Sequence, residues 1–404
     1  MTAAASSPTD PGATPTTARS LAPDLARGGM LLLIALANVH VYVYGHPIGP
    51  RGYPTALDST DQVVALLQMT LVDGRAYPLF GLLFGYGIVQ LAWRRSAVGL
   101  PAPAVTKLVR RRGAWMIVIG LAHGVLLWPG DIIGCYGLLA VLMAGMLVRG
   151  TDRALITTAI VGVVVVTLLN AGSGIPLPGE QNAFLPSMTI ENPLAALAVR
   201  SVEWIGIGLL FQSIGVFAAV ALGAWAARRR LLDEPERHRP LLVRLAVAGI
   251  AAAVLLGLPM AMLAAELWTA PPIGLVLLAG ALHTIGGYAG GIGYAAAFGL
   301  LAIRLAQRDG PGPIAHALQA CGQRSLSCYL AQSVAFVALL PAWTLGLGND
   351  AHLWQTALLA IGTWLVILLV ADASERAGYR GPAEILLRRL TYGARRTPQP
   401  ARAS

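Results

Sequence analysis

The chain alternates long apolar runs with short polar connections. An apolar helix of about 20 residues is long enough to cross the hydrocarbon core of a bilayer. Runs of this kind predict an all-α, polytopic integral membrane helix bundle of about ten transmembrane helices. We place them near residues 28–45, 63–92, 113–128, 131–148, 153–171, 202–227, 240–265, 272–303, 325–347 and 353–374.

Composition and charge support this class and give it a direction. The chain of 404 residues is 56% apolar and only 12% charged, which is not the composition of a soluble protein. Basic residues mark cytoplasmic loops. With ten spans and the N-terminus inside, only Arg51, Arg75 and Arg200 of the 29 basic residues lie outside or near the outer surface. We therefore expect a multi-pass protein of the cell membrane with both termini cytoplasmic.

The net charge of +10 also bears on partners. Clusters of Lys and Arg flank apolar spans, so they indicate orientation in a lipid bilayer, and no nucleic acid is expected as a partner. Whether two copies of the chain form a homodimer stays open at this point.

The spans form one predicted transmembrane domain, residues 27–374. A charged linker, residues 228–239, divides it into an N-terminal half that holds the candidate site, residues 27–227, and a C-terminal half, residues 240–374.

Each end of the chain reads as a cytoplasmic tail. Residues 1–26 begin with a stretch rich in Ala, Ser, Thr and Pro and are predicted to be disordered. Residues 375–404 are basic, and leucines alternate there with Arg388 and Arg389. This pattern predicts a short amphipathic helix at the membrane surface.

The cysteines and the glycines carry no cofactor motif. Cys135, Cys321 and Cys328 lie in or beside apolar runs without metal-ligand spacing, so neither a disulfide framework nor a metal site is expected. Residues 286–299, GGYAGGIGYAAAFG, contain small residues four apart, which predicts close helix packing and not a nucleotide loop. No bound cofactor is predicted.

The second apolar run, 30 residues long, exceeds what one perpendicular helix needs and must tilt or break. Residues 76–93 already suffice to cross, which leaves Asp73 and Arg75 near the outer face and residues 63–72 interfacial or re-entrant. Two interpretations of Asp73 and Arg75 stay open, a solvated turn and an intramembrane charged site.

Two polar residues share one spacing from a basic anchor. Asn38 follows Arg27 by eleven residues, and His123 follows Arg112 by the same interval. Eleven residues make about three helical turns, so each pair lies on one helix face roughly 16 Å apart. If both arginines lie at the cytoplasmic interface, Asn38 and His123 lie at matched depth and can share a polar cavity.

Structural roles remain open for each of these residues. Asn38 can join helices through hydrogen bonds, His123 can be a satisfied packing residue, and Asp131 is placed to cap the fourth span. An ionisable group at membrane depth is nevertheless a functional candidate. We assign His123, Asn38 and Asp131 as candidate catalytic residues, with His40 and His46 as alternative bases.

The ninth run adds polar groups near mid-membrane. Gln332 and Ser333 lie about 12 Å along the helix from Arg324 and either line the same cavity or pack. The candidate substrate- or cofactor-binding residues are Arg27, Asp73, Arg75, Arg112, Tyr329 and Gln332.

Five stretches carry a family resemblance. RSLAPDLARGGMLLLIALANVH resembles the opening of the YeiB-like family, whose common domain is labelled domain of unknown function 418. LVDGRAYPLFGLLFGYG, GLAHGVLLWPGDIIGCYG, GQRSLSCYLAQS and GPAEILLRRLTYG are similar as well. The chain departs from the family pattern at Ser327 and Cys328, where Thr-Asn is usual, and at Ala383 and Ile385, where Leu and Trp are usual.

This family resembles the membrane acyltransferase superfamily, whose members take an acyl group from cytosolic acyl-CoA and deliver it to a sugar on the far side. The resemblance implies acyl-CoA as a co-substrate and an unidentified acceptor, such as a glycan or a lipid. Many members carry His where this chain has Asn38, so a general base must come from elsewhere. The alternative is a transporter of a small molecule, with the same cavity and His123 as a proton relay.

Overall fold

The computed structural model describes residues 21–176, 182–308 and 312–393. Most of the predicted N-terminal tail, and the last residues of the predicted C-terminal tail, lie outside the described residues. Residues 21–26, assigned to the tail from the sequence, form the first turns of α1, where Asp24 and Leu25 are buried. The membrane-type bundle therefore begins ahead of Arg27.

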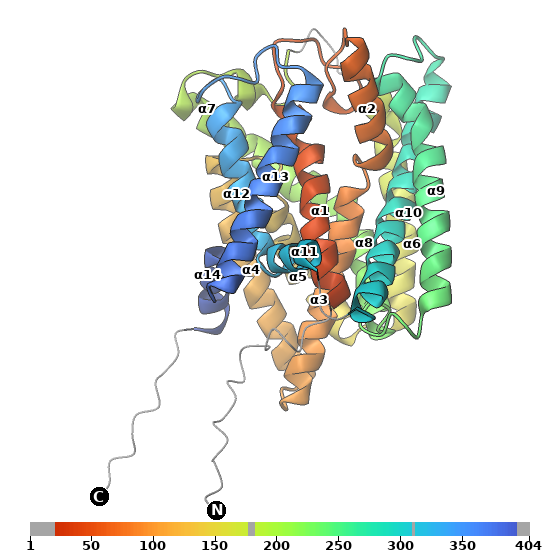
Figure 1. Ribbon diagram of the computed structural model, residues 1–404, viewed down its shortest axis with the longest axis vertical. Helices are drawn as coiled ribbons and strands as arrows, with labels where there is room; N and C mark the ends of the chain where they lie inside the picture. The colour runs from red at the N-terminus through yellow and green to blue at the C-terminus, as the bar shows by residue number, and fades with distance from the viewer. Residues whose placement is uncertain (1–20, 177–181, 309–311, 394–404) are drawn as a thin grey trace, which may run out of the picture.

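The described residues are helical throughout, joined by turns and isolated bridges without a strand (Figure 1). This confirms the all-α class. The helices are α1 Leu21–Val39, α2 Ser59–Leu71, α3 Ala76–Ala97, α4 Ala102–Leu126, α5 Ile132–Arg149, α6 Asp152–Asn170, α7 Pro193–Glu203, the π-helix η6 Trp204–Phe211, α8 Gln212–Arg228, α9 Arg239–Ala264, α10 Ile273–Ala306, α11 Pro313–Gln323, α12 Ser325–Leu339, α13 Leu353–Arg376 and α14 Pro382–Tyr392.

Eight segments of the described chain are long and apolar enough to cross a membrane. They correspond to eight of the ten predicted runs and confirm a membrane helix bundle. The other two runs, 113–128 and 325–347, fall on α4, which has basic residues in its first half, and on α12, which is a shorter apolar helix. The count of ten and the orientation in the membrane stay predictions.

The predicted break in the second run is confirmed. α2 ends at Leu71 and α3 begins at Ala76, with a turn between them. Gly74 has φ of +74°, a left-handed conformation that residues with a Cβ rarely adopt. The turn lets one apolar run contribute two helices.

The glycines of α10 pack as the sequence predicted. A Cβ at Gly287 would lie 2.3 Å from the Gly74 carbonyl oxygen, and one at Gly293 would lie 2.9 Å from the Ile250 nitrogen. α10 therefore contacts both the break between α2 and α3 and the neighbouring helix α9 at backbone distance.

Arg27 of α1 and Tyr392 of α14 both lie near Arg112 of α4 at one end of the bundle, which we term the inner end. Figure 1 shows α14 beside α4 at the lower end. α2 and α7 lie at the opposite, upper end, which the charge pattern predicts to face outside and which we term the outer end. The predicted C-terminal amphipathic helix is present as α14.

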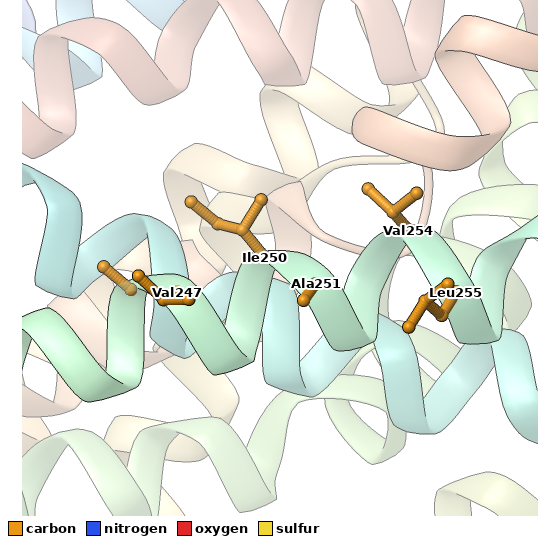
Figure 2. A pocket seen from close by; sticks show the side chains of 6 residues that line it. Val247, Ile250, Ala251, Val254 and Leu255 are labelled. Carbon is orange, nitrogen blue, oxygen red and sulfur yellow. The ribbon is translucent and has the colours of Figure 1, made fainter.

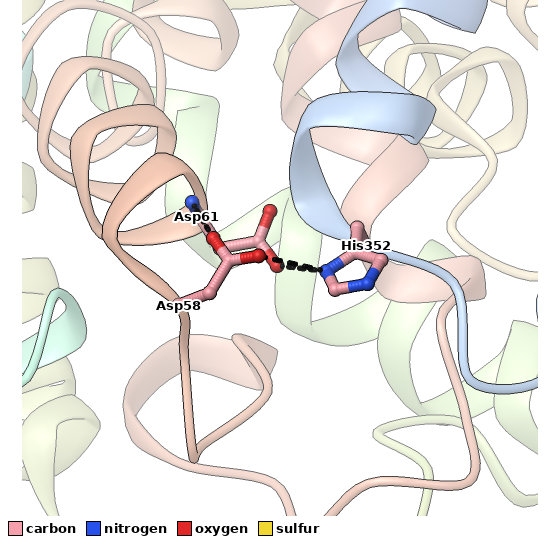
Figure 3. Close-up of side chains that lie close together, drawn as sticks. All are labelled: Asp58, Asp61 and His352. Carbon is pink, nitrogen blue, oxygen red and sulfur yellow. Dashed lines mark hydrogen bonds and ion pairs between the residues drawn. The ribbon is translucent and has the colours of Figure 1, made fainter.

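A cluster of three side chains joins α2 to α13 at the outer end (Figure 3). Asp58 caps α2 by accepting a hydrogen bond from the Asp61 N–H at 2.8 Å. Asp61 in turn accepts from the Trp354 N–H at 3.0 Å and lies 2.8 Å from Nδ1 of His352. We term Asp58, Asp61 and His352 the outer clamp.

We predict the topology from the basic-residue asymmetry. Glu191 lies in the outer loop and Ser96 at the inner end, and both are exposed, whereas the three native cysteines are buried. A membrane-impermeant maleimide applied to intact cells should label Glu191→Cys, and should label Ser96→Cys only after lysis. The reverse pattern would invert the orientation.

We also predict that the outer clamp makes stability pH-dependent. The hydrogen bond with Asp61 raises the pKa of His352 above its usual 6.5. A raised folded-state pKa contributes stability fully below the unfolded value, and this is lost as pH rises through the folded pKa. We therefore expect the difference in melting temperature between wild type and His352→Gln to be largest below pH 6.5 and to become smaller at higher pH. This difference should be small, since the His352 side chain is 47% exposed. Asp61→Asn removes the charged partner of His352 and should abolish the pH dependence of the difference.

Candidate functional site

The turn between α4 and α5 places a histidine beside a buried carboxylate. Asp131 caps α5, because its side chain accepts from the Ile133 N–H at 3.0 Å and the Gly134 N–H at 2.6 Å. The capping role expected from the sequence is therefore confirmed. Its Oδ1 also lies 2.8 Å from Nδ1 of His123.

Both side chains of this pair are almost fully buried, at 1% exposed for His123 and 0% for Asp131. A carboxylate that accepts several N–H groups is best satisfied in its ionised form, which only accepts. It therefore fixes the proton of His123 on Nδ1. The opposite nitrogen, Nε2, is left as an acceptor, and it is buried without a hydrogen-bond partner among the described residues.

A π-helix that the sequence did not single out supports Asp131 from the other side. Trp204, the first residue of η6, donates from Nε1 to Oδ2 of Asp131 at 3.4 Å. A Cβ at Gly124 would lie 1.9 Å from the Trp204 ring, and one at Gly208 would lie 2.2 Å from the Pro129 carbonyl oxygen. π-helical turns are rare and occur frequently at functional sites. The only sequence signal is a tryptophan at the start of an apolar run in which Gly206 and Gly208 follow it.

Tyrosines connect the His123 pair to Asn38. The Tyr329 ring lies 5.1 Å from the His123 ring, centroid to centroid, and its hydroxyl accepts from the Ile132 N–H at 3.5 Å. Tyr77 lies near Tyr329, and the Tyr77 hydroxyl donates to Oδ1 of Asn38 at 2.6 Å. We term His123, Asp131, Tyr329, Tyr77 and Asn38 the His123 group.

Three other candidate residues, Gln332, Arg27 and Arg112, lie outside the His123 group. Gln332 donates to the Leu31 carbonyl oxygen at 2.9 Å and so joins α12 to α1. Arg27 pairs with Asp24 at 3.1 Å at the inner end, near Arg112. These two arginines anchor the helices that carry Asn38 and His123, roughly 16 Å along each helix from the polar residue.

Asp73 and Arg75 form a separate buried group. Asp73 is held by Arg51 through two hydrogen bonds, of 2.7 and 2.9 Å. Arg75 is fully buried, donates to the Ala253 carbonyl oxygen at 2.6 Å, and contacts His283. Of the two interpretations left open above, the structure favours the buried charged site over the solvated turn.

Arg51, predicted to lie outside or near the outer surface, has its backbone in the turn Pro50–Gly52 at the outer end. Its side chain, however, reaches inward to Asp73. The φ of Arg51 is +57°, a strained conformation for a residue with a Cβ, which the ion pair with Asp73 helps to hold.

One group in the described chain has the side chains of a metal site. The ligand atoms of the outer clamp lie within 4.8 Å of one another. Both oxygens of Asp61 are already engaged, by the Trp354 N–H and by His352. Joining α2 to α13 accounts for this arrangement without a metal.

The groove shown in Figure 2 has a different character from the His123 group. It has a volume of about 560 Å³ and is formed by apolar side chains of one helix, α9. Its lining residues are Ala246, Val247, Ile250, Ala251, Val254 and Leu255. An apolar helix face of this kind suits contact with lipid.

The fold and the buried polar groups define a multi-pass helical membrane protein. Residues 226–394 match the model of a family described as "Protein of unknown function (DUF418)". The recognition of this family from the sequence is thereby confirmed. A relative described as "Uncharacterized protein YxaH", from Bacillus subtilis (strain 168), is 26% identical over 345 residues, covering 78% of this chain and 78% of the relative.

We predict that the contact between Gly124 and Trp204 is essential for packing of the site. Gly124→Ala should lower the free energy of unfolding by about 1–3 kcal/mol, because the added methyl group has no room beside the indole. Gly215→Ala, in the adjoining helix α8, places its methyl in open space and should change stability by less than about 1 kcal/mol. Thermal unfolding of the purified proteins measures both, and equal stability of the two variants would contradict the prediction.

Proposed function

We propose that this protein is a membrane-embedded acyltransferase that moves an acyl group from cytosolic acyl-CoA to an acceptor at the outer side of the cell membrane. One observation carries the proposal. His123 is fixed by Asp131 through Nδ1, while Nε2 is buried and unpartnered among the described residues. A histidine oriented in this way by a carboxylate is the arrangement of a general base.

In the proposed reaction, Nε2 of His123 accepts the proton of an acceptor hydroxyl or amine. The acceptor oxygen or nitrogen attacks the thioester carbonyl carbon, and the carbon–sulfur bond then breaks. The protonated imidazole returns its proton to the CoA thiolate that leaves. A positioned base of this kind contributes about 10² to 10⁴ in rate.

Asp131 and Asn38 have supporting roles in this scheme. Asp131 keeps the imidazole in one tautomer and stabilises its protonated form. Asn38 accepts from Tyr77 through Oδ1, which leaves its amide N–H groups available to the oxyanion of the tetrahedral intermediate. Loss of one such donor typically costs about 10² to 10³ in rate.

The inner end offers cations for the CoA phosphates. α3 ends and α4 begins with exposed or half-buried basic residues, and Arg112 lies on the same helix as His123. Arginine and lysine bind phosphate through charge-assisted hydrogen bonds. The basic residues concerned are Arg94, Arg95, Lys107, Arg110, Arg111 and Arg112.

A second candidate function is transport of a small molecule. The break between α2 and α3 places Asp73 and Arg75 inside the bundle, and discontinuous helices with buried charges are typical of transporter sites. Flux of a solute into proteoliposomes in the absence of acyl-CoA would favour this alternative.

The test of the acyltransferase proposal is substitution of the base. His123→Gln and His123→Ala should lower acyl transfer from acetyl-CoA or a longer acyl-CoA by at least about 10², while acyl-CoA binding is retained. His316 is the matched control, because it pairs with Asp372 at 2.6 Å on the half-exposed surface of α11. His316→Gln should transfer at the wild-type rate. Wild-type activity in a folded His123→Ala protein would exclude this histidine and direct attention to His46 and His40.

A further inference from the structure

Four side chains packed together at the outer end each carry a buried hydrogen-bond donor without an acceptor among the described residues. The donors are the Arg200 guanidinium at Nη1, the Trp128 and Trp343 indoles at Nε1, and the Tyr42 hydroxyl. Arg200 is 2% exposed, Tyr42 1% and Trp128 3%. We term these four residues the donor cluster.

The donor cluster is assembled from four segments that are distant in the sequence. The Arg200 guanidinium lies 4.0 Å from the centre of the Trp343 ring, and Tyr42 stacks on Trp128 at 4.5 Å. Tyr42, Trp128 and Trp343 pack in one hydrophobic cluster, which brings the two stacked pairs together. The stacking holds each donor in a fixed direction before any ligand arrives.

The protein uses only part of the hydrogen-bonding capacity of Arg200. Its Nε donates to the Val125 carbonyl oxygen at 2.9 Å. The carboxylate that interacts with Arg200, Glu203, is held by the Ser187 N–H at 3.0 Å and the Ser187 hydroxyl at 2.6 Å. Glu203 thus offsets charge at a distance, while Nη1 of Arg200 is left for another acceptor.

The chemistry of the donors defines the ligand class. A guanidinium and two indole N–H groups donate only, so they require a group that accepts only. A buried donor without a partner costs free energy, which a multidentate acceptor would recover. Phosphate has several acceptor oxygens, carries the opposite charge, and matches the geometry of arginine.

We propose that the donor cluster is a binding site for a phosphate group. Tryptophan and tyrosine side chains gather at the depth of lipid headgroups in membrane proteins. The phosphate can belong to a lipid of the outer leaflet or to free phosphate, and both present the same oxygens to the cluster.

The site adjoins the His123 group. Trp128 follows His123 by five residues, and its backbone N–H donates to the His123 carbonyl oxygen at 3.0 Å, so its indole remains without an acceptor among the described residues. A phosphate-bearing molecule held here would lie at the outer end of α4, the helix that carries the proposed base. Binding itself does not depend on the proposed transfer, because it is measured without acyl-CoA.

The test measures binding to the purified full-length protein in detergent by calorimetry. The probes are dihexanoyl phosphatidic acid, inorganic phosphate, and dihexanoylglycerol, which lacks the phosphate. Phosphatidic acid or inorganic phosphate should bind, and Arg200→Gln should weaken that binding by about tenfold or more. Trp343→Phe keeps an aromatic ring at this position, removes the pyrrole part of the indole with its N–H, and should weaken binding several-fold.

A matched pair at the inner end provides the control. Arg229 lies 4.2 Å from the centre of the Trp225 ring, so Arg229→Gln and Trp225→Phe make the same chemical changes away from the site. Both should bind the probes as wild type does.

Each outcome decides the proposal. Tighter binding of phosphatidic acid than of inorganic phosphate identifies a lipid headgroup, and the reverse order identifies free phosphate. Equal binding of dihexanoylglycerol, or no loss in both Arg200→Gln and Trp343→Phe, overturns the site. If Arg200→Gln does not fold, Trp343→Phe against Trp225→Phe decides. Phosphate binding that persists when His123→Ala abolishes transfer separates this site from the proposed activity.

Discussion

The buried carboxylate of Asp131 is the interaction on which the outer half of the bundle depends. Its two oxygens receive hydrogen bonds from the first turn of α5, from His123 on α4 and from Trp204 on the π-helix. A carboxylate in an apolar interior is unfavourable unless several donors compensate for lost hydration. Those donors come from three helices, so satisfying one charge fixes the positions of all three.

The same constraint explains why polar residues occur in groups. Asp73 accepts hydrogen bonds from Arg51 of an outer turn. Arg75 donates to a backbone carbonyl of one neighbouring helix and contacts His283 of another. Tyr77 follows Arg75 by two residues at the start of α3 and is hydrogen-bonded to Asn38, so it lies between this group and the His123 group. Polar contacts therefore extend across the bundle, while its faces toward lipid remain apolar.

The group around Asp73 and the His123 group differ in how many of their polar atoms lack a hydrogen-bond partner among the described residues. Around Asp73 most charged atoms have partners within the protein, which suits a structural role at the break between α2 and α3. Around His123 the unpartnered atoms include Nε2 and the neighbouring Trp128 indole. Unused hydrogen-bonding capacity beside an oriented histidine is the reason to seek chemistry at His123 first.

The sequence by itself determined the features that depend on local pattern. Apolar runs predicted the membrane helices, the excess length of the second run predicted its break, and small residues four apart predicted the close packing of α10. Asp131 was recognised as a cap because capping needs only the residues directly after it.

Only the tertiary structure decided which polar side chains meet. Equal spacing from Arg27 and Arg112 fixed the depth and helix face of Asn38 and His123, but two tyrosines from other helices determine how they are connected. Trp204, Arg200 and Trp343 lie far along the chain from their partners, and no periodicity relates them. Hydrogen bonds and ring contacts between distant segments form only when helix packing sets the distance, and that packing is a property of the whole bundle.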